Sequence, residues 1–283
     1  MRLLFLEYPK LSVSLSVPDN VAEGFRTNFA NAIASPPPAT VQVEFLVRQR
    51  NADLALEKNG TLIGVFPNPT ELIFALEENL ENALIERLDG WIGLHAGAVA
   101  LPDMSIVTVG HPDTGKTTTT FQLVELGLEL LCEEVTPIDP STIRVHPFPG
   151  VLTLDRRYAE AFRASYPVTG GALTYHSVEM ARYAAGRVRK EAVPLGALLF
   201  PAFDPSCRPR LEALSPAEVL TDIFQYCFTP TVDDEQLYDS VIRVIERCRL
   251  FRMHTRDIES ARGLLVELLS ELARAGAINQ GSA

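Results

Sequence analysis

The stretch Gly110-His-Pro-Asp-Thr-Gly115-Lys116-Thr117 matches the pattern G-x-x-x-x-G-K-[ST]. An apolar run from Ser105 to Val109 precedes it, and a helix is expected from about residue 115 to 126, ending at Gly127. In this order of strand, loop and helix, glycines let backbone N–H groups point inward, and the helix N-terminus adds positive charge. The sequence therefore predicts a phosphate-binding loop at residues 110–117, called the phosphate loop below.

The phosphate loop also predicts which side chains meet a nucleotide. Lys116 would contact the β- and γ-phosphates, and the Thr117 hydroxyl would contact Mg²⁺. The residues expected to bind the nucleotide are Gly110, His111, Pro112, Asp113, Thr114, Gly115, Lys116, Thr117 and Thr118.

Titratable residues flank the loop on both sides. His95 begins the segment His-Ala-Gly-Ala-Val-Ala, and Glu133-Glu134 follows an apolar run from Leu128 to Cys132. A Glu-Glu pair alone is more often solvated, and a lone histidine is more often structural. Beside a phosphate loop, one carboxylate can hold the metal and another can accept a proton from an attacking hydroxyl. These three residues are therefore candidates for catalysis.

Alternating and helical patterns surround this region. Residues 11–17 and 41–47 alternate apolar and polar positions, and Asn59-Gly60 joins two apolar segments as a hairpin turn would. A helix is expected to begin after Asn68 and end at Gly90. Residues 1–88 are therefore predicted to form a small, mainly β N-terminal domain, and residues 277–283 a tail.

Residues 89–276 are predicted to form an α/β domain with a mostly parallel sheet, because short apolar runs alternate with turns and helices. Expected strands include residues 97–101, 105–109, 128–132 and 193–200. The C-terminal third is predicted to be helical, over about 215–228, 234–249 and 257–273, with a strand near 250–253.

Composition limits the function classes. The chain has 283 residues and a net charge of −11, which disfavours a nucleic-acid partner. The four cysteines are widely spaced without C-x-x-C, so neither a zinc knuckle nor a disulfide framework is indicated. No apolar run approaches membrane-span length, and no signal sequence is evident. We therefore expect a soluble, cytoplasmic protein with no membrane partner.

The segments beginning at His95 and Gly110, followed by Leu130-Leu-Cys-Glu-Glu-Val-Thr-Pro-Ile-Asp139, resemble the catalytic core of the HPr kinase/phosphorylase family. Val145-His-Pro-Phe-Pro-Gly150 and the helical C-terminal end are more similar to a related branch found in modified-peptide biosynthesis, such as that of lasso peptides. The motif-level similarity covers about residues 94–150. The resemblance implies a P-loop kinase core of the HPr-kinase C-terminal type.

The resemblance also implies a serine-type kinase that uses ATP and Mg²⁺. By position, Glu133 matches the acidic residue implicated in activating the acceptor hydroxyl, Glu134 matches the neighbouring acidic residue, and His95 completes the site. The resemblance does not divide metal binding and base work between the two glutamates, and we assign the metal to Thr117 and Glu134. The family often has Asp where this chain has Glu133, and its arginine- and glycine-rich segment after the core has no close counterpart here. HPr recognition and phosphorolysis are therefore not implied.

The expected acceptor is a serine of a small protein or precursor peptide. A non-catalytic nucleotide-binding module in a peptide-processing system and a small-metabolite kinase remain alternatives, and homo-oligomerisation stays open. Several arginines are candidates for stabilising the charge of the transferred phosphoryl group, although exposed solubilising residues are the commoner case. They are Arg156, Arg157, Arg182, Arg187 and Arg189.

Overall fold

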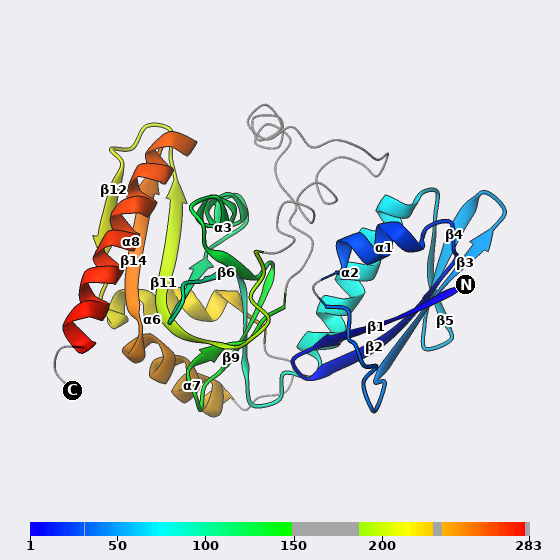
Figure 1. Ribbon diagram of the computed structural model, residues 1–283. Helices are drawn as coiled ribbons and strands as arrows, with labels where there is room; N and C mark the ends of the chain where they lie inside the picture. The colour runs from blue at the N-terminus through cyan, green and yellow to red at the C-terminus, as the bar shows by residue number, and fades with distance from the viewer. Residues whose placement is uncertain (31, 149–186, 229–233, 281–283) are drawn as a thin grey trace.

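A computed structural model describes residues 1–30, 32–148, 187–228 and 234–280. The chain forms two sheets with helices packed on them (Figure 1). The N-terminal sheet has the strand order β1-β2-β3-β4-β5, and the second sheet follows the path β10-β9-β6-β7-β11-β14-β12, with β8 and β13 paired to β6. This is a mixed α/β architecture.

The elements of the N-terminal part are β1 (Arg2–Tyr8), β2 (Leu11–Val17), α1 (Ala22–Asn28), β3 (Val43–Arg50), β4 (Asp53–Lys58), β5 (Thr61–Phe66) and α2 (Pro69–Ile85). The second sheet contains β6 (Ile92–Ala100), β7 (Ser105–Val109), β8 (Glu129–Cys132), β9 (Val135–Asp139), β10 (Arg144–Val145), β11 (Val193–Phe203), β12 (Arg210–Ala213), β13 (Cys227–Phe228) and β14 (Arg249–Thr255). Its helices are α3 (Lys116–Glu125), α6 (Pro216–Ile223), the 3₁₀ turn η1 (Phe224–Tyr226), α7 (Asp234–Arg247) and α8 (Ile258–Gln280).

Local sequence signals explain the N-terminal sheet and its helix. Alternate residues of β2, beginning with Leu11, are buried, while the serines between them are partly exposed. The predicted hairpin turn is present: Asn59 and Gly60 have φ angles of 51° and 79°, which favour a tight β4–β5 connection. The Asn68 side chain accepts hydrogen bonds from the first turn of α2, so the helix begins where the sequence predicts.

The prediction of a mostly parallel second sheet is wrong. Among the named strands of the described ranges, β11 pairs in parallel with β7 and β14, whereas β6 pairs antiparallel with β7, β8, β9 and β13. The physical reason is the length of the connections. A few residues join β6 to β7, with Leu101 N donating to Met104 O at 2.8 Å, and a parallel crossover needs a dozen or more.

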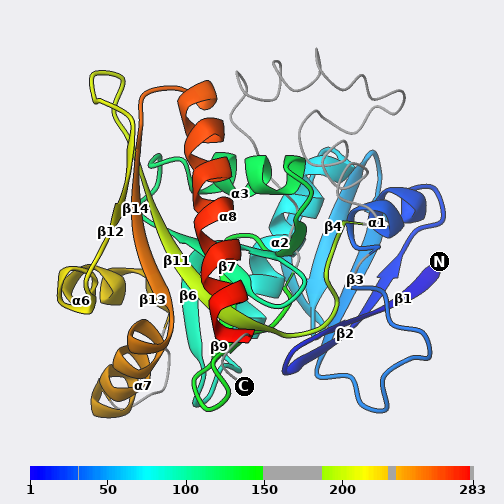
Figure 2. The ribbon, with the colours of Figure 1, turned by 60° about the vertical axis from the view of Figure 1, so that its left-hand side comes forward.

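The two faces of the second sheet carry different helices (Figure 2). Residues of α3 and α8 pack with one set of strand residues, which includes Leu199 and Phe251. Residues of α6 and α7 pack on the opposite face with Leu198 and Phe200, in a core that continues into the N-terminal sheet. The alternation of neighbouring β11 residues between these cores identifies β11 as a central strand covered on both sides.

Two expected helices have different ends. The helix expected over 215–228 ends at Ile223, because Cys227 and Phe228 pair with Leu94 and Gly93 of β6 as a strand. The last helix, α8, continues to Gln280, beyond the expected residue 273. The strands β1, β9, β10 and β12 have no counterpart among the individually predicted strands.

Each of the four cysteines is a free thiol, and Cys132 is buried. Across the described ranges, no helix is both long enough and apolar enough to cross a membrane.

Candidate functional site

The phosphate loop lies between β7 and α3, as the motif predicts. Its tight course depends on positive φ angles, 64° at Asp113 and 96° at Gly115, the latter being the residue just before α3. At Gly110 a Cβ atom would lie 2.7 Å from Thr114 Oγ1, so the loop leaves no room for a larger residue in this conformation. These features make a compact turn at the N-terminus of a helix, which is where backbone N–H groups bind phosphate.

Lys116 lies at the first position of α3 and is buried. Its Nζ donates a hydrogen bond to His111 O at 3.2 Å, across the phosphate loop. Burial lowers the pKa of the lysine, whereas the nearby carboxylates of Glu134, Glu133 and Asp113 act in the opposite direction. The ammonium group is therefore held between the loop and the acidic pair that follows β8.

Glu133 is the most buried carboxyl group of the site, with 2% of the residue exposed. Its Oε2 atom has no hydrogen-bond partner. Burial, together with the charge of Glu134, raises the pKa of Glu133 to about 8, while a hydrogen bond with Thr117 and the charge of Lys116 oppose this shift. A buried carboxyl oxygen without a partner is costly, so this atom is a place where a cation would be stabilised.

Glu134 points to a different partner. Its Oε2 lies 2.7 Å from His95 Nε2, where the ring N–H donates to the carboxylate. This hydrogen bond is the main cause that keeps the pKa of Glu134 below its ordinary value. A φ angle of 61° at Glu134 turns the backbone between the two glutamates, so consecutive side chains reach Thr117 and His95, respectively.

Three further residues border the site and were not predicted from sequence. The Tyr226 ring lies 5.0 Å from the His111 ring, and the Phe228 ring lies 5.8 Å from the His95 ring, centroid to centroid. Glu81 of α2 is close enough for its charge to raise the pKa of Glu133. None of these residues belongs to a motif, because each approaches through tertiary packing. The sequence carries no signal that singles out any of the three.

The residues present fit a magnesium-bound phosphate group. The hydroxyl of Thr117 and the partnerless oxygen of Glu133 are hard oxygen ligands of the kind that Mg²⁺ prefers. Within the described ranges, no group of three or more His, Cys, Asp or Glu side chains forms a metal cage. In nucleotide sites Mg²⁺ is commonly held by one or two protein oxygens together with phosphates and waters.

The structure thus brings together His95, Lys116, Thr117, Glu133 and Glu134. It does not bring the candidate arginines 187 and 189 to the phosphate loop. Arg187 Nη1 donates to Val124 O at 3.2 Å, near the far end of α3, and Arg189 Nε donates to Glu129 Oε2 at 2.6 Å. The candidates Arg156, Arg157 and Arg182 lie outside the described residues.

Among the comparisons with known proteins, the one with solved structures found matches. No family model and no curated protein matches the chain. Solved structures do match, and among them is the Hpr(Ser) kinase/phosphatase from Coxiella burnetii, with 10% identity, a TM-score of 0.35, and coverage of 67% of this chain and 98% of that one. A likeness at this TM-score carries no argument about function.

Proposed function

We propose that this protein is a kinase that transfers the γ-phosphoryl group of ATP, with Mg²⁺, to a hydroxyl group, namely a serine of a small protein or peptide. One observation carries the proposal: Lys116 of the phosphate loop lies within the electrostatic reach of two adjacent carboxyl groups, one facing Thr117 and the other paired with His95. Phosphoryl transfer needs a phosphate grip, a metal and a group that receives the proton of the hydroxyl, all in one place.

The loop and Lys116 would bind the phosphates of the nucleotide. Backbone N–H groups of the loop and the first turn of α3 would surround the β-phosphate, and Lys116 would exchange its bond with the His111 carbonyl for phosphate oxygens. Thr117 and Glu133 would hold Mg²⁺, which neutralises charge on the transferring group when it is bound. The contacts therefore favour Glu133 rather than the expected Glu134 as the metal ligand.

The proton acceptor is then Glu134. Its side chain is 45% exposed, so an acceptor hydroxyl can approach it from solvent. His95 holds one carboxylate oxygen, and the second oxygen is available to orient the hydroxyl. The acceptor oxygen forms a bond to the γ-phosphorus, the bond to the β,γ-bridging oxygen breaks, ADP leaves, and the hydroxyl proton passes to Glu134. This division reverses the assignment made from the sequence.

The proposed acceptor class comes from the resemblance of the His95, phosphate-loop and Glu-Glu segments to HPr kinases. The acidic character of the chain, with its net charge of −11, fits a polypeptide or small alcohol acceptor better than a nucleic acid. A serine-containing precursor peptide is the first candidate to test.

The test combines ATP binding, measured calorimetrically with Mg²⁺, and transfer of labelled phosphate to serine-containing peptides, small proteins and small alcohols. Lys116→Ala should abolish both binding and transfer. Glu134→Gln should reduce transfer at least a hundredfold and leave ATP binding within about threefold. Glu267→Gln, an exposed carboxylate change on α8, is the matched control and should change neither. ATP binding without transfer to any of these acceptors would instead indicate a non-catalytic nucleotide-binding module.

A further inference from the structure

The carboxyl ends of β7, β11 and β14 lie along one edge of the second sheet, because these three strands are parallel. The phosphate loop follows β7 at this edge. Phe203 ends β11 and pairs with Thr255, the last residue of β14. The acidic pair lies on the other side of β7, beyond β6. A ligand seated in the loop can therefore extend along the edge in two opposite directions.

Two exposed apolar side chains occur on the β11–β14 side. Phe203 is 54% exposed and Ile258, at the start of α8, is 46% exposed. The backbone at or near each residue contacts the phosphate loop or α3. Gln122 Nε2 of α3 donates to Ile258 O at 3.2 Å, and a Cβ atom at Gly110 would lie 3.8 Å from Pro201 O, two residues before Phe203.

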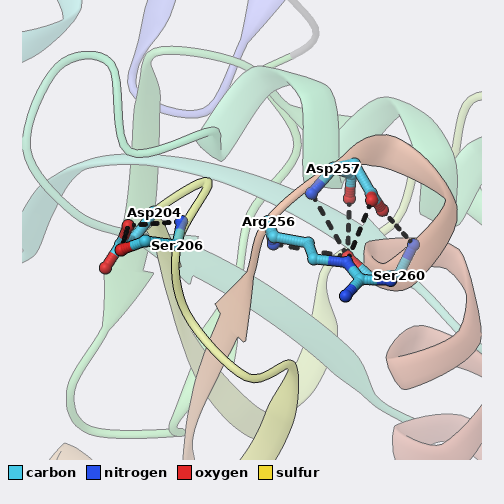
Figure 3. Close-up of polar contacts among 5 residues, drawn as sticks. All are labelled: Asp204, Ser206, Arg256, Asp257 and Ser260. Atoms are coloured by element: carbon cyan, nitrogen blue, oxygen red, sulfur yellow. Dashed lines mark hydrogen bonds and ion pairs between the residues drawn. The ribbon is translucent and has the colours of Figure 1, made fainter.

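Two hydrogen-bonded turns adjoin these residues along the chain, one directly after Phe203 and one around Ile258 (Figure 3). In the first, Asp204 accepts hydrogen bonds from the backbone N and the hydroxyl of Ser206, at 2.8 and 2.6 Å. In the second, Asp257 accepts from Ser260 N at 2.7 Å, and Arg256 Nε lies 3.2 Å from Asp257 Oδ2. Asp204 N donates to Thr255 O at 2.9 Å, which joins the first turn to the end of β14. Hydrogen-bonded polar turns therefore flank both apolar residues along the chain.

We propose that the base of the bound nucleotide stacks on the ring of Phe203, with Ile258 beside it and Arg256 at the rim. This inference rests on the proposed function, because it assumes that the triphosphate occupies the phosphate loop. The γ-phosphate must face Glu133 and Glu134 for transfer, so the nucleoside end must leave the loop on the opposite side, where β11 and β14 end. Ligands of open α/β sheets lie outside the carboxyl ends of the strands, and aromatic rings accept any base by stacking.

The experiment compares two ligands that share phosphates but differ in the base. Calorimetric titrations with Mg²⁺-ATP and with Mg²⁺-tripolyphosphate are made on the full chain, its Phe203→Ala and Phe203→Tyr variants, and Val266→Ala, an exposed apolar control on α8. Phe203→Ala should weaken ATP binding about tenfold and leave tripolyphosphate binding unchanged, whereas Phe203→Tyr should bind ATP like the parent. Val266→Ala should change neither affinity.

The outcomes separate this inference from the proposed function. If the parent binds neither ligand, both proposals fail. If the parent binds ATP and Phe203→Ala binds it equally well, the base lies elsewhere, and the proposed kinase function is unaffected. Equal losses for ATP and tripolyphosphate would show that Phe203 supports the loop rather than the base, which also overturns the inference. Thermal unfolding of each variant verifies that it is folded.

Discussion

The hydroxyl oxygens of Thr108 and Thr120 lie 2.6 Å apart in the core beneath the phosphate loop. Thr108 also donates to Gly97 O at 3.0 Å, so its single proton is used and Thr120 must be the donor to Thr108. The resulting chain of hydrogen bonds connects α3, β7 and β6. It fixes the helix that carries Lys116 relative to the strand that carries His95.

Substitution of Gly97 should disrupt this connection. A Cβ atom at Gly97 would lie 2.2 Å from Thr120 Oγ1 and 3.0 Å from Thr108 Oγ1. We expect Gly97→Ala to lower the free energy of unfolding by about 1–3 kcal/mol, measured by chemical denaturation, because the buried pair must move. Gly263→Ala is the control: nothing lies within 4 Å of its Cβ position on α8, so it should stabilise by about 0.5–1 kcal/mol. Equal stability of the two variants would contradict the packing described here.

Removal of His95 should change the pH dependence of phosphoryl transfer. The hydrogen bond from His95 lowers the pKa of Glu134, so His95→Ala should raise that pKa toward its ordinary value. If Glu134 accepts the proton, the acid limb of the pH–rate profile moves to higher pH, whereas the rate near neutrality changes little because the carboxyl is ionised there in both proteins. ATP binding should persist. A rate that falls uniformly at all pH values would argue against this role for the pair.

Glu81 should make stability depend on pH. Burial, with the charges of Glu134 and Glu78, raises its pKa in the folded protein from 4.5 to about 7. The contribution of protonated Glu81 to the free energy of unfolding is then fully present below pH 4.5. It is lost as the pH rises through 7, where the folded state must ionise this group. At pH 8, Glu81→Gln should therefore have a free energy of unfolding higher than that of the parent by on the order of 1 kcal/mol, after allowing for partial exposure, and should unfold at a higher temperature. Unfolding curves at pH 5 should nearly coincide; an unchanged difference at both pH values would refute the shift.

The start of α2 offers a test that does not involve the site. Asn68 Oδ1 accepts hydrogen bonds from Thr70 N at 3.1 Å and Glu71 N at 3.0 Å. Asn68→Ala should cost about 1 kcal/mol of unfolding free energy, because two backbone donors lose their partner. Asn68→Asp retains an acceptor and should restore most of the stability. Failure of Asp to restore it would mean that Asn68 acts through another contact.

Elements that depend on residues close together in the sequence could be predicted from it. The turn of residues 110–115 between β7 and α3, the β4–β5 hairpin and the cap of α2 each depend on residues within a few positions of one another, and all three are present. The approach of His95 to Glu134 and of Lys116 to both carboxyl groups could be proposed only because the phosphate loop gave a reason to group them.

Other features could not be predicted because they depend on contacts distant in sequence. The antiparallel pairing around β6 brings together strands from three parts of the chain, and Phe228 leaves its expected helix to join that strand. Arg189 is distant from the phosphate loop in sequence. In the structure it pairs with Glu129 and not with a residue of the loop. The direction of each glutamate also depends on one backbone angle, at Glu134, that has no sequence signature.

The antiparallel register of β6 has a consequence for how this chain can tolerate change. One strand carries both His95, which meets Glu134, and Gly97, which makes space for Thr120. Because side chains alternate between the two faces of a strand, insertion or deletion of a single residue within 92–100 would exchange those faces for part of β6. Length variation should therefore be far more damaging here than in the turn of residues 101–104 between β6 and β7, even where every amino acid of the site is retained.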